Sequence, residues 1–600
     1  MAESMQGFKR TNYANDFDSS FIGKEAAVTG WVNKQRDIGS LVFIDIRDRT
    51  GLVQVVFDET IDVPLLEKAK TVRNEFVLAV KGTVRQRSGA FNKNIKTGEI
   101  EIVATELRIL SAAEPTPFVI ASEIEANDVL RLKYRYLDMR RPQVQKNIIM
   151  RHKIAKIARD YYDDNGFLEI ETPFLTKSTP EGARDYLVPS RVHPEKFYAL
   201  PQSPQLYKQL LMIAGFDRYI QIARCFRDED LRADRQPEFT QIDLEMSFVD
   251  MDDVIEINEG FLKKLFKDVL NADIKTPFLR LDYKEAMDRY GCDKPDNRFG
   301  LELCDITETV KDVDFKVFSD AIAAGGSVRC INGEGMGAKL SRKEIDALGE
   351  FVKTHGAKGL AYVILTEEGV KSPIAKFLTD DQMAALIEKA KGKTDDIIFI
   401  VSDKSDVVFT ALSALRCELA RKFELYKEDD YSFLWVTNFP LLEYDEEEKR
   451  YAAKHHPFTS PRDEDIEKLD TAPGETRAKA YDVVLNGTEI GGGSIRIYDT
   501  ELQSKMFEVL GFTEEEAWER FGFLLEAFKY GPPPHGGMAY GLDRLAMIMT
   551  GSPSIRDVIA FPKVQNASEL MTNAPDFVDQ KQLTELNIKT VPSQKGEKFE

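Results

Sequence analysis

A polar loop between two apolar runs carries three arginines that could bind a phosphate chain. The runs are 219–226 and 239–248, and the loop contains Arg227, Arg232 and Arg235 among acidic residues. Alternating apolar and polar residues predict a strand on each side of the loop. A guanidinium presents a planar pair of donors to phosphate oxygens. The pattern predicts a triphosphate-binding loop, while a solvated hairpin loop with salt bridges is the alternative.

A second stretch, residues 481–497, predicts a β-hairpin that brings two carboxylates together. Asn486 and Gly487 are typical of a type I′ turn, and with these two residues as the loop Asp482 and Glu489 share one face. Two such carboxylates can hold Mg²⁺, a hard cation that takes few protein oxygens and otherwise binds phosphate and water. A surface hairpin with unrelated charges is the alternative.

Two further arginines are placed to bind anions. Arg496 has the opposite parity from Glu489 on an ideal strand, but the glycine run 491–493 could supply a bulge that reverses it. The proline- and glycine-rich stretch 531–541 leads into a helix that carries Arg544 in its first turn. A helix N-terminus beside an arginine favours an anion.

The pair His455-His456 raises the question of a metal site. No cysteine or carboxylate stands at ligand spacing from the pair, which disfavours zinc. A hydrogen bond to a substrate and a buried structural histidine both remain open.

Several elements must position these groups. We expect a helix over 143–164, a strand over 167–173 that Pro173 assigns to a sheet edge or an interface, and a helix with Ser203 as N-cap and Pro204 as its first residue. The basic stretch 130–142 could contact RNA or form salt bridges between domains.

Composition indicates a soluble protein of several domains, because single cores stop growing near ~250–300 residues. The 600-residue chain is 43% hydrophobic and 30% charged, with a net charge of −20. Residues 1–112 have a net charge of +1, so the acidic residues in excess lie in the rest of the chain. An acidic protein of this kind can still have one specific RNA-binding site. The five cysteines are widely spaced, no apolar run is long enough for a membrane helix, and we expect a cytoplasmic protein.

The N-terminal segment has the order of an OB-fold. Strands are expected near 27–33, 40–47, 51–57, 75–84 and 99–110, with a helix over 63–72 between the third and fourth. Arg36, Phe43 and Gln54 could contact single-stranded nucleic acid, although Phe43 could equally belong to the core. The fold class is α+β, divided into an OB-fold domain (1–112), a linker (113–142), a first catalytic part (143–296), an inserted α+β domain (297–428), a second catalytic part (429–566) and a C-terminal extension (567–600).

Taken together, three stretches give the chain its resemblance to a known family. Residues 143–173, 226–243 and 541–544 are similar to motifs 1, 2 and 3 of class II aminoacyl-tRNA synthetases. With the N-terminal barrel and the insertion at 297–428, the chain resembles the bacterial-type aspartyl-tRNA synthetases. The resemblance implies an antiparallel catalytic sheet flanked by helices, and a homodimer formed through motif 1.

The resemblance also implies residue roles. Arg227, Glu489 and Arg544 would be catalytic, and Asp482 and Glu489 would bind Mg²⁺. ATP would be bound by Arg227, Asp228, Glu229, Gln236, Glu489, Gly541, Leu542, Asp543 and Arg544. Aspartate would be bound by Glu181, Gln205, Lys208, Arg227, Asp243, His455 and Arg496. Arg36, Phe43 and Gln54 would read the anticodon.

The implied reaction activates L-aspartate with ATP and transfers it to the 3′ end of tRNA(Asp). The attacking carboxylate is already ionised, so positioning and charge neutralisation suffice without a general base. Ile38 stands where relatives that also charge asparagine tRNA often carry histidine, which suggests a discriminating enzyme. Asparaginyl or lysyl synthetases, and an inactive synthetase-like RNA-binding protein, are the alternatives.

Overall fold

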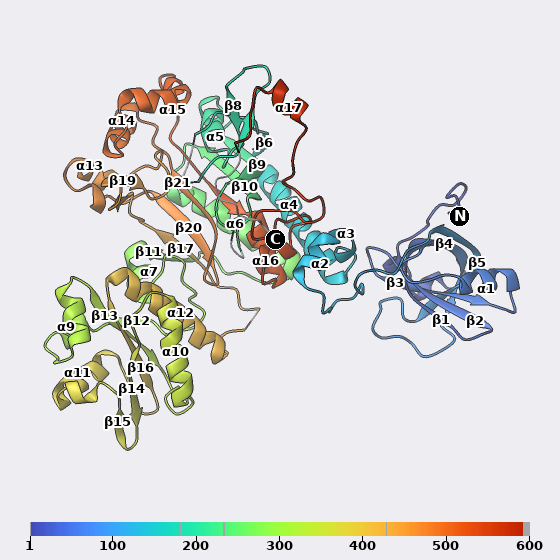
Figure 1. Cartoon of the computed structure of the whole chain (residues 1–600), viewed down its shortest axis with the longest axis horizontal. Coiled ribbons are helices and arrows are strands. Elements are labelled where there is room, and N and C mark those ends of the chain that lie inside the picture. The colour runs from blue at the N-terminus through green and yellow to red at the C-terminus, as the bar shows by residue number, and fades with distance from the viewer. Residues whose placement is uncertain (1, 180–182, 232–233, 428, 592–600) are drawn as a thin grey trace. The chain divides into compact units, whose positions relative to one another are not determined.

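The computed structural model describes residues 2–179, 183–231, 234–427 and 429–591 (Figure 1). The chain divides into two compact units, one formed by residues up to 149 with 556–576, the other by residues 150–555 and those from 577 onward. Within the described ranges, no helix is long and apolar enough to cross a membrane.

The first unit contains a closed five-stranded barrel with the order β1-β2-β3-β5-β4. Its strands and helix are β1 (Glu25–Asp37), β2 (Leu41–Arg47), β3 (Leu52–Asp58), α1 (Val63–Lys70), β4 (Val77–Gln86) and β5 (Ile100–Ser111). Alternate residues such as Val42, Ile44 and Ile46 point into the barrel core, as the period of two predicts. The predicted OB-fold is confirmed.

The basic stretch after the barrel is used in salt bridges. It forms α2 (Asp128–Lys133) and α3 (Arg135–Asp138), and Asp138 is buried and paired with Arg131, Arg135 and Arg141. Arg135 also donates to carbonyl groups in 556–560 of the same unit. These contacts favour the salt-bridge interpretation over free RNA-binding side chains.

The second unit is built on an eight-stranded sheet with the order β11-β17-β20-β21-β22-β10-β9-β6. The six inner strands are antiparallel, and the two edge strands pair in parallel with their neighbours. The strands are β6 (Leu168–Glu169), β9 (Arg218–Phe226), β10 (Glu238–Ser247), β11 (Leu279–Asp282), β17 (Phe433–Thr437), β20 (Ala480–Leu485), β21 (Thr488–Ile495) and β22 (His535–Gly541).

Helices α5 (Gln205–Ile213), α6 (Met251–Leu270), α7 (Tyr283–Tyr290) and α16 (Leu542–Thr550) contact this sheet, and α14 (Thr500–Val509) shares a hydrophobic core with β17 and β20. Helix α15 (Glu514–Phe528) packs against α5 and α14, and α4 (Pro142–Asp164) precedes β6. A buried aromatic cluster of Tyr162, Phe261 and Tyr540 joins α4, α6 and β22. Both tyrosine hydroxyls donate to the Asn258 side-chain oxygen, at 2.8 and 3.0 Å, so burial of the rings leaves these donors satisfied. The smaller elements are β7 (Leu187–Pro189), β8 (Phe197–Ala199), β18 (Leu442–Asp445), β19 (Arg450–Ala453), α13 (Lys468–Thr471) and α17 (Gln580–Glu585).

Two local predictions need correction. The strand expected over 167–173 is only Leu168–Glu169, because the paired stretch ends before Pro173, although β6 does lie at a sheet edge. Helix α5 begins at Gln205, so Pro204 is its N-cap rather than its first residue. Ser203, the residue before this N-cap, accepts a hydrogen bond from the Gln205 N–H through its hydroxyl oxygen at 3.3 Å.

The inserted segment forms its own antiparallel sheet, with the order β12-β13-β16-β14-β15. Residues such as Ile331 and Phe399 face a core with α10 and α12, while Cys330 and Ile400 face a second core with α8, α9 and α11. Both faces are therefore covered. The elements are β12 (Leu303–Asp305), α8 (Thr307–Val310), α9 (Lys316–Ala323), β13 (Ser327–Gly333), α10 (Arg342–Thr354), β14 (Ala361–Thr366), β15 (Gly369–Lys371), α11 (Asp380–Lys389), β16 (Ile397–Asp403) and α12 (Ser405–Lys422).

Candidate active site

Four buried charged residues form a network across α5, β10 and the end of β21. Lys208 Nζ lies 2.9 Å from Asp243 Oδ2 and 3.2 Å from Glu245 Oε2. Glu245 also accepts from Arg496, with Oε1 2.9 Å from Nε and Oε2 3.1 Å from Nη2. Each of the four side chains is at most 3% exposed. Glu245 therefore holds the two predicted substrate-binding cations at a fixed separation.

The two carboxylates of this network titrate differently. Burial raises the pKa of Asp243 to about 6, in spite of the nearby Lys208. Burial also opposes ionisation of Glu245, but the charges of Arg496 and Lys208 outweigh it and lower the pKa of Glu245 to about 2. Asp243 Oδ1 is buried and has no hydrogen-bond partner in the described part of the chain. Since buried polar atoms are nearly always paired, this oxygen is a candidate acceptor for a ligand.

Both histidines of the pair are buried, and His456 belongs to the same network. Its Nε2 lies 2.7 Å from Arg496 Nη1, and because a guanidinium only donates, Nε2 must be unprotonated. Burial first, and then Arg496, lower the pKa of His456 well below its usual range. His455 has its pKa lowered to about 4, chiefly by burial, and its buried Nδ1 lacks a partner among the described residues.

Sequence reasoning missed Glu245 and His456. Glu245 lies two residues after Asp243 in an alternating strand, so the period of two places both side chains on one face. That spacing was an available signal. The pair His455-His456 is visible in the sequence, but nothing near it indicates that His456 contacts Arg496, which lies 40 positions further along the chain.

Two other predicted ligand residues present unsatisfied polar atoms. Gln205 Nε2 and Arg227 Nε are buried and lack hydrogen-bond partners within the residues that the structure describes. The Arg227 guanidinium lies 5.0 Å from the centre of the Phe239 ring, which fixes its plane beside the sheet. Glu181 falls outside the described residues.

The arginine loop connects β9 and β10, as its flanking alternation predicts. The Arg227 N–H donates to the Pro237 carbonyl oxygen at 2.9 Å. Glu229 is paired with Arg235 at 2.9 Å, and the Asp228 carboxylate lies 3.4 Å from the Arg184 guanidinium. Gln236 is also buried in this loop, and Arg232 lies outside the described residues.

Register in the β20–β21 hairpin follows the prediction. Both turn residues, Asn486 and Gly487, have positive φ, and Glu489 pairs with Val484. A bulge at Ile490, just before the glycine run, reverses the parity, so that Arg496 shares the parity of Glu489. The predicted register reversal is confirmed, although the bulge lies at Ile490, one residue before the glycine run where we expected it.

The Asp482 carboxylate packs directly over a glycine of the opposite strand. A Cβ on Gly492 would lie 2.2 Å from Asp482 Oδ1, so a larger residue there would displace the carboxylate. Burial, and then the neighbouring charges of Glu489 and Asp293, raise the pKa of Asp482 well above its usual range. A cation would relieve this concentration of negative charge, and two carboxylates suit Mg²⁺ better than a softer metal.

Motif 3 lies at the junction of β22 and α16. Arg544 Nη1 donates to the Glu489 carbonyl oxygen at 2.7 Å, and its Nη2 lies 3.3 Å from Asp234. Asp543 is buried with both oxygens in use, one 2.8 Å from Arg151 and the other accepting the Thr240 N–H at 2.9 Å. Asp543 thus holds α4 and β10 against α16. Gly541 and the buried Leu542 complete the turn.

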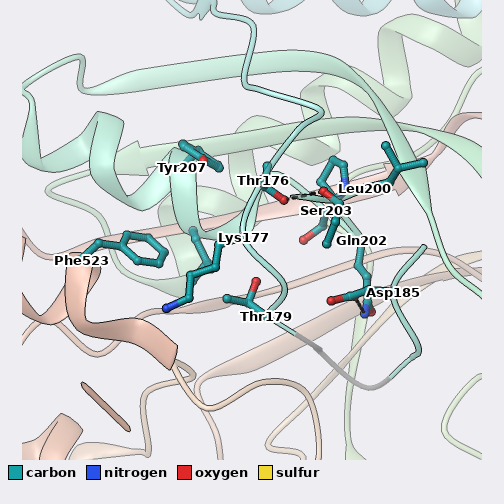
Figure 2. A pocket seen from close by; sticks show the side chains of 12 residues that line it. Thr176, Lys177, Thr179, Asp185, Leu200, Gln202, Ser203, Tyr207 and Phe523 are labelled. Atoms are coloured by element: carbon teal, nitrogen blue, oxygen red, sulfur yellow. Dashed lines mark hydrogen bonds between the residues drawn. The ribbon is translucent and has the colours of Figure 1, made fainter. Parts of the chain in front are cut away.

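A small cavity lies beside this site, between the loop at 176–179, α5 and α15 (Figure 2). It measures about 120 Å³, below the roughly 300–1,000 Å³ of a typical ligand pocket. Figure 2 shows Lys177 and Phe523 on one side and Gln202 with Asp185 on the other, where Gln202 Nε2 donates to Asp185 at 2.6 Å. None of the four charged network residues lines this cavity. We therefore place the candidate active site at the network.

The three predicted anticodon residues lie together on the barrel. Arg36 is paired with Phe43 across β1 and β2, and its Nη2 donates to Gln54 Oε1 at 2.8 Å. Gln54 Nε2 in turn donates to Glu101 at 2.8 Å, so its amide orientation is fixed. Phe43 is half-buried and outside the barrel core, with Arg36 over its ring, which favours the platform interpretation.

Comparison with known families agrees with this geometry. Residues 127–565 match the model for class II tRNA synthetases (D, K and N), and residues 26–110 match the OB-fold nucleic acid binding domain. The chain belongs to the class II aminoacyl-tRNA synthetases of the D, K and N group. The membership predicted from the three motifs is confirmed.

Relatives are similar over almost their whole length. The chain is 63% identical over 590 residues to an aspartate–tRNA ligase of Ruminiclostridium cellulolyticum, covering 98% of this chain and 99% of the relative. It is 60% identical to an aspartate–tRNA(Asp/Asn) ligase of Caldanaerobacter subterraneus, covering 98% and 100%. The fold is similar to asparaginyl-tRNA synthetase of Pyrococcus horikoshii, with a TM-score of 0.58 and 19% identity over 92% of this chain and 98% of that one.

Proposed function

We propose that this chain is an aspartate–tRNA ligase, which activates L-aspartate with ATP and transfers it to the 3′ end of tRNA(Asp). The observation that carries the proposal is the buried pair of cations, Lys208 and Arg496, held by Glu245. The names of the relatives support the same amino acid. The chain has all of the candidate phosphate- and metal-binding residues, Arg227, Glu229, Glu489 and Arg544. An inactive RNA-binding relative would not need them.

In the first step, the α-carboxylate of aspartate attacks the α-phosphorus of ATP and pyrophosphate leaves. Arg227 neutralises charge at the α-phosphate and the attacking carboxylate, and Arg544 binds the γ-phosphate. Glu229, Gln236 and Asp228 help to position ATP in the loop between β9 and β10. The nucleophile is already ionised, so these groups accelerate the reaction by positioning and charge stabilisation.

Asp482 and Glu489 would hold Mg²⁺ beside the phosphates. The raised pKa of Asp482 and the close fit of its carboxylate over Gly492 support a cation there. When bound, the ion would neutralise charge on the phosphate oxygens. Arg544, which donates to the Glu489 backbone, keeps the phosphate-binding helix next to these carboxylates.

Selectivity for aspartate comes from the charge of the pocket. Lys208 and Arg496 face the side-chain carboxylate, while Asp243, with Gln205, His455 and Glu181, binds the remaining polar groups of the amino acid. Asparagine would bring a neutral amide to two buried cations and would lose the charge-assisted contacts that a carboxylate makes with them, a difference worth several kcal/mol. The buried Asp243 Oδ1, which has no hydrogen-bond partner among the described residues, supports binding of the α-ammonium group of the amino acid beside Asp243.

The barrel reads the anticodon through Arg36, Phe43 and Gln54. Ile38 is 63% exposed between β1 and β2, and an apolar side chain there favours charging of tRNA(Asp) over tRNA(Asn). The names of the relatives include both specificities. Measuring aminoacylation of purified tRNA(Asp) and tRNA(Asn), by the wild-type chain and by Ile38→His, distinguishes the two specificities.

A homodimer would form through α4 and the exposed edge strand β6, where Leu168 is half exposed. The five free cysteines support a reducing compartment such as the cytoplasm. Sedimentation of the full chain tests the dimer.

The first test is ATP–pyrophosphate exchange with aspartate, asparagine, glutamate and lysine. We expect exchange with aspartate alone. Exchange with asparagine or lysine instead would assign the chain to a different member of the group. Failure with every amino acid, both with and without tRNA, would reject the enzymatic proposal.

A further inference from the structure

Two cysteines of the inserted domain face each other on adjacent strands. Strands β12 and β13 lie side by side in Figure 1 and pair antiparallel, with Cys304 directly opposite Cys330. The Ile306 N–H donates to the Val328 carbonyl oxygen at 3.0 Å, so alternate pairs, Cys304–Cys330 included, share ladder hydrogen bonds. Such pairs have Cα atoms about 5.5 Å apart. Disulfide-linked residues have Cα separations of roughly 4.4–6.8 Å, so the backbone spacing suits a bond.

The two side chains also lie on the same face of the sheet. Cys330 is fully buried in the core beneath α8 and α11, and Cys304 packs against that core from a partly exposed position. Directly opposed Cβ atoms are about 4.5–5.5 Å apart, whereas a disulfide needs roughly 3.5–4.5 Å. β12 has three residues and lies at the sheet edge with β13 as its neighbour. A short edge strand can move by the ångström that this difference requires.

The thiols differ in reactivity. The neighbouring Cys330 thiol, together with the charges of Lys389 and Lys391, lowers the pKa of Cys304 to about 7. The Cys304 Sγ lies 3.2 Å from the Lys389 carbonyl oxygen. By contrast, the pKa of the Cys330 thiol is raised well above its usual range, by the neighbouring Cys304 thiol first and then by burial. The thiolate is the nucleophile in thiol chemistry, so Cys304 combines thiolate character with access to solvent.

We propose that Cys304 and Cys330 are a thiol modification site, in which Cys304 reacts with a small-molecule disulfide of the glutathione class and Cys330 resolves the adduct. The Cys304 thiolate attacks one sulfur of oxidised glutathione, and the other glutathione leaves as a thiolate. Cys330 then loses its proton and attacks the Cys304 sulfur, which releases the second glutathione. Overall, two protein thiols lose two electrons and two protons, and one glutathione disulfide becomes two thiols.

The test treats the reduced full chain with oxidised glutathione and measures intact mass and disulfide-linked peptides. We expect the loss of two hydrogens, one cross-link between the peptides of Cys304 and Cys330, and full reversal by a dithiol reductant. Cys330→Ser should stop at a stable glutathione adduct on Cys304, and Cys304→Ser should yield neither product at Cys330. Cys417→Ser is the control, because that exposed cysteine lies outside the pair.

The wild-type measurement decides the proposal even if a variant fails to fold. A chain that keeps both thiols under conditions that oxidise a free dithiol peptide would overturn it. So would a wild-type chain that accumulates a lasting glutathione adduct on Cys304, since Cys330 would then not resolve it.

Discussion

Replacing Glu245 by Gln tests whether this residue positions the two cations of the amino-acid pocket. Glu245 makes three close contacts, one with Lys208 and two with Arg496. The amide keeps one acceptor for Arg496 Nε, but its NH₂ group would face Lys208 Nζ and Arg496 Nη2, which are donors. Two charge-assisted contacts are lost, each worth about 1.5–3 kcal/mol.

Losing these two contacts lowers both the free energy of unfolding and the rate of catalysis. Removing one partner from a buried ion pair costs about 3–5 kcal/mol, because it leaves charge uncompensated. If about 3 kcal/mol of it falls on the transition state, kcat/KM for aspartate in ATP–pyrophosphate exchange decreases about 100-fold. We expect KM for ATP to change little, because we propose that the network binds aspartate and not ATP.

The assay measures exchange over a range of aspartate concentrations, together with thermal unfolding of each variant. Glu302→Gln is the matched control, since Glu302 of the inserted segment forms an exposed pair with Arg289 of α7 at 2.6 Å. Exposed pairs contribute about 0–1 kcal/mol, so this variant should retain its activity. Unchanged exchange and unchanged melting in Glu245→Gln would refute the positioning role.

Three other predictions follow from the site. The folded-state pKa of Asp243 is raised to about 6, so its ionisation opposes folding: its contribution to stability falls as pH rises from about 4 to 6 and is constant above that. Asp243→Asn should remove up to about 3 kcal/mol of this pH dependence in denaturant titrations, and an unchanged profile would contradict the assignment. Gly492→Ala should displace the Asp482 carboxylate and raise the Mg²⁺ concentration needed for exchange at least severalfold, while Gly359→Ala, where a Cβ meets open space, should leave the Mg²⁺ titration unaltered. Arg544→Ala should reduce exchange by about 100-fold or more, because a charge-neutralising group is lost from the phosphates, and wild-type adenylate formation would disprove its assigned role.

Local sequence patterns predicted most of the elements. Period-two alternation located β9 and β10, and Asn486-Gly487 located the β20–β21 turn, because these signals depend on neighbouring residues only. Boundaries were less accurate where proline is involved. Proline restricts the backbone near Pro173 and Pro204, but the residue at which β6 ends or α5 begins also depends on tertiary packing. The sequence pattern alone does not show which of the two decides the boundary.

The family, the order of strands in the barrel and the types of residue at the site follow from residue order alone, because motifs and periodicity depend on neighbouring residues. Only the tertiary structure brought together Lys208, Glu245 and Arg496, which three separate elements supply from positions up to 288 residues apart. It likewise set Cys304 opposite Cys330. The pKa values of Asp243 and Glu245 were also decided there, because the removal of water and the distances to other charges depend on packing of the whole domain.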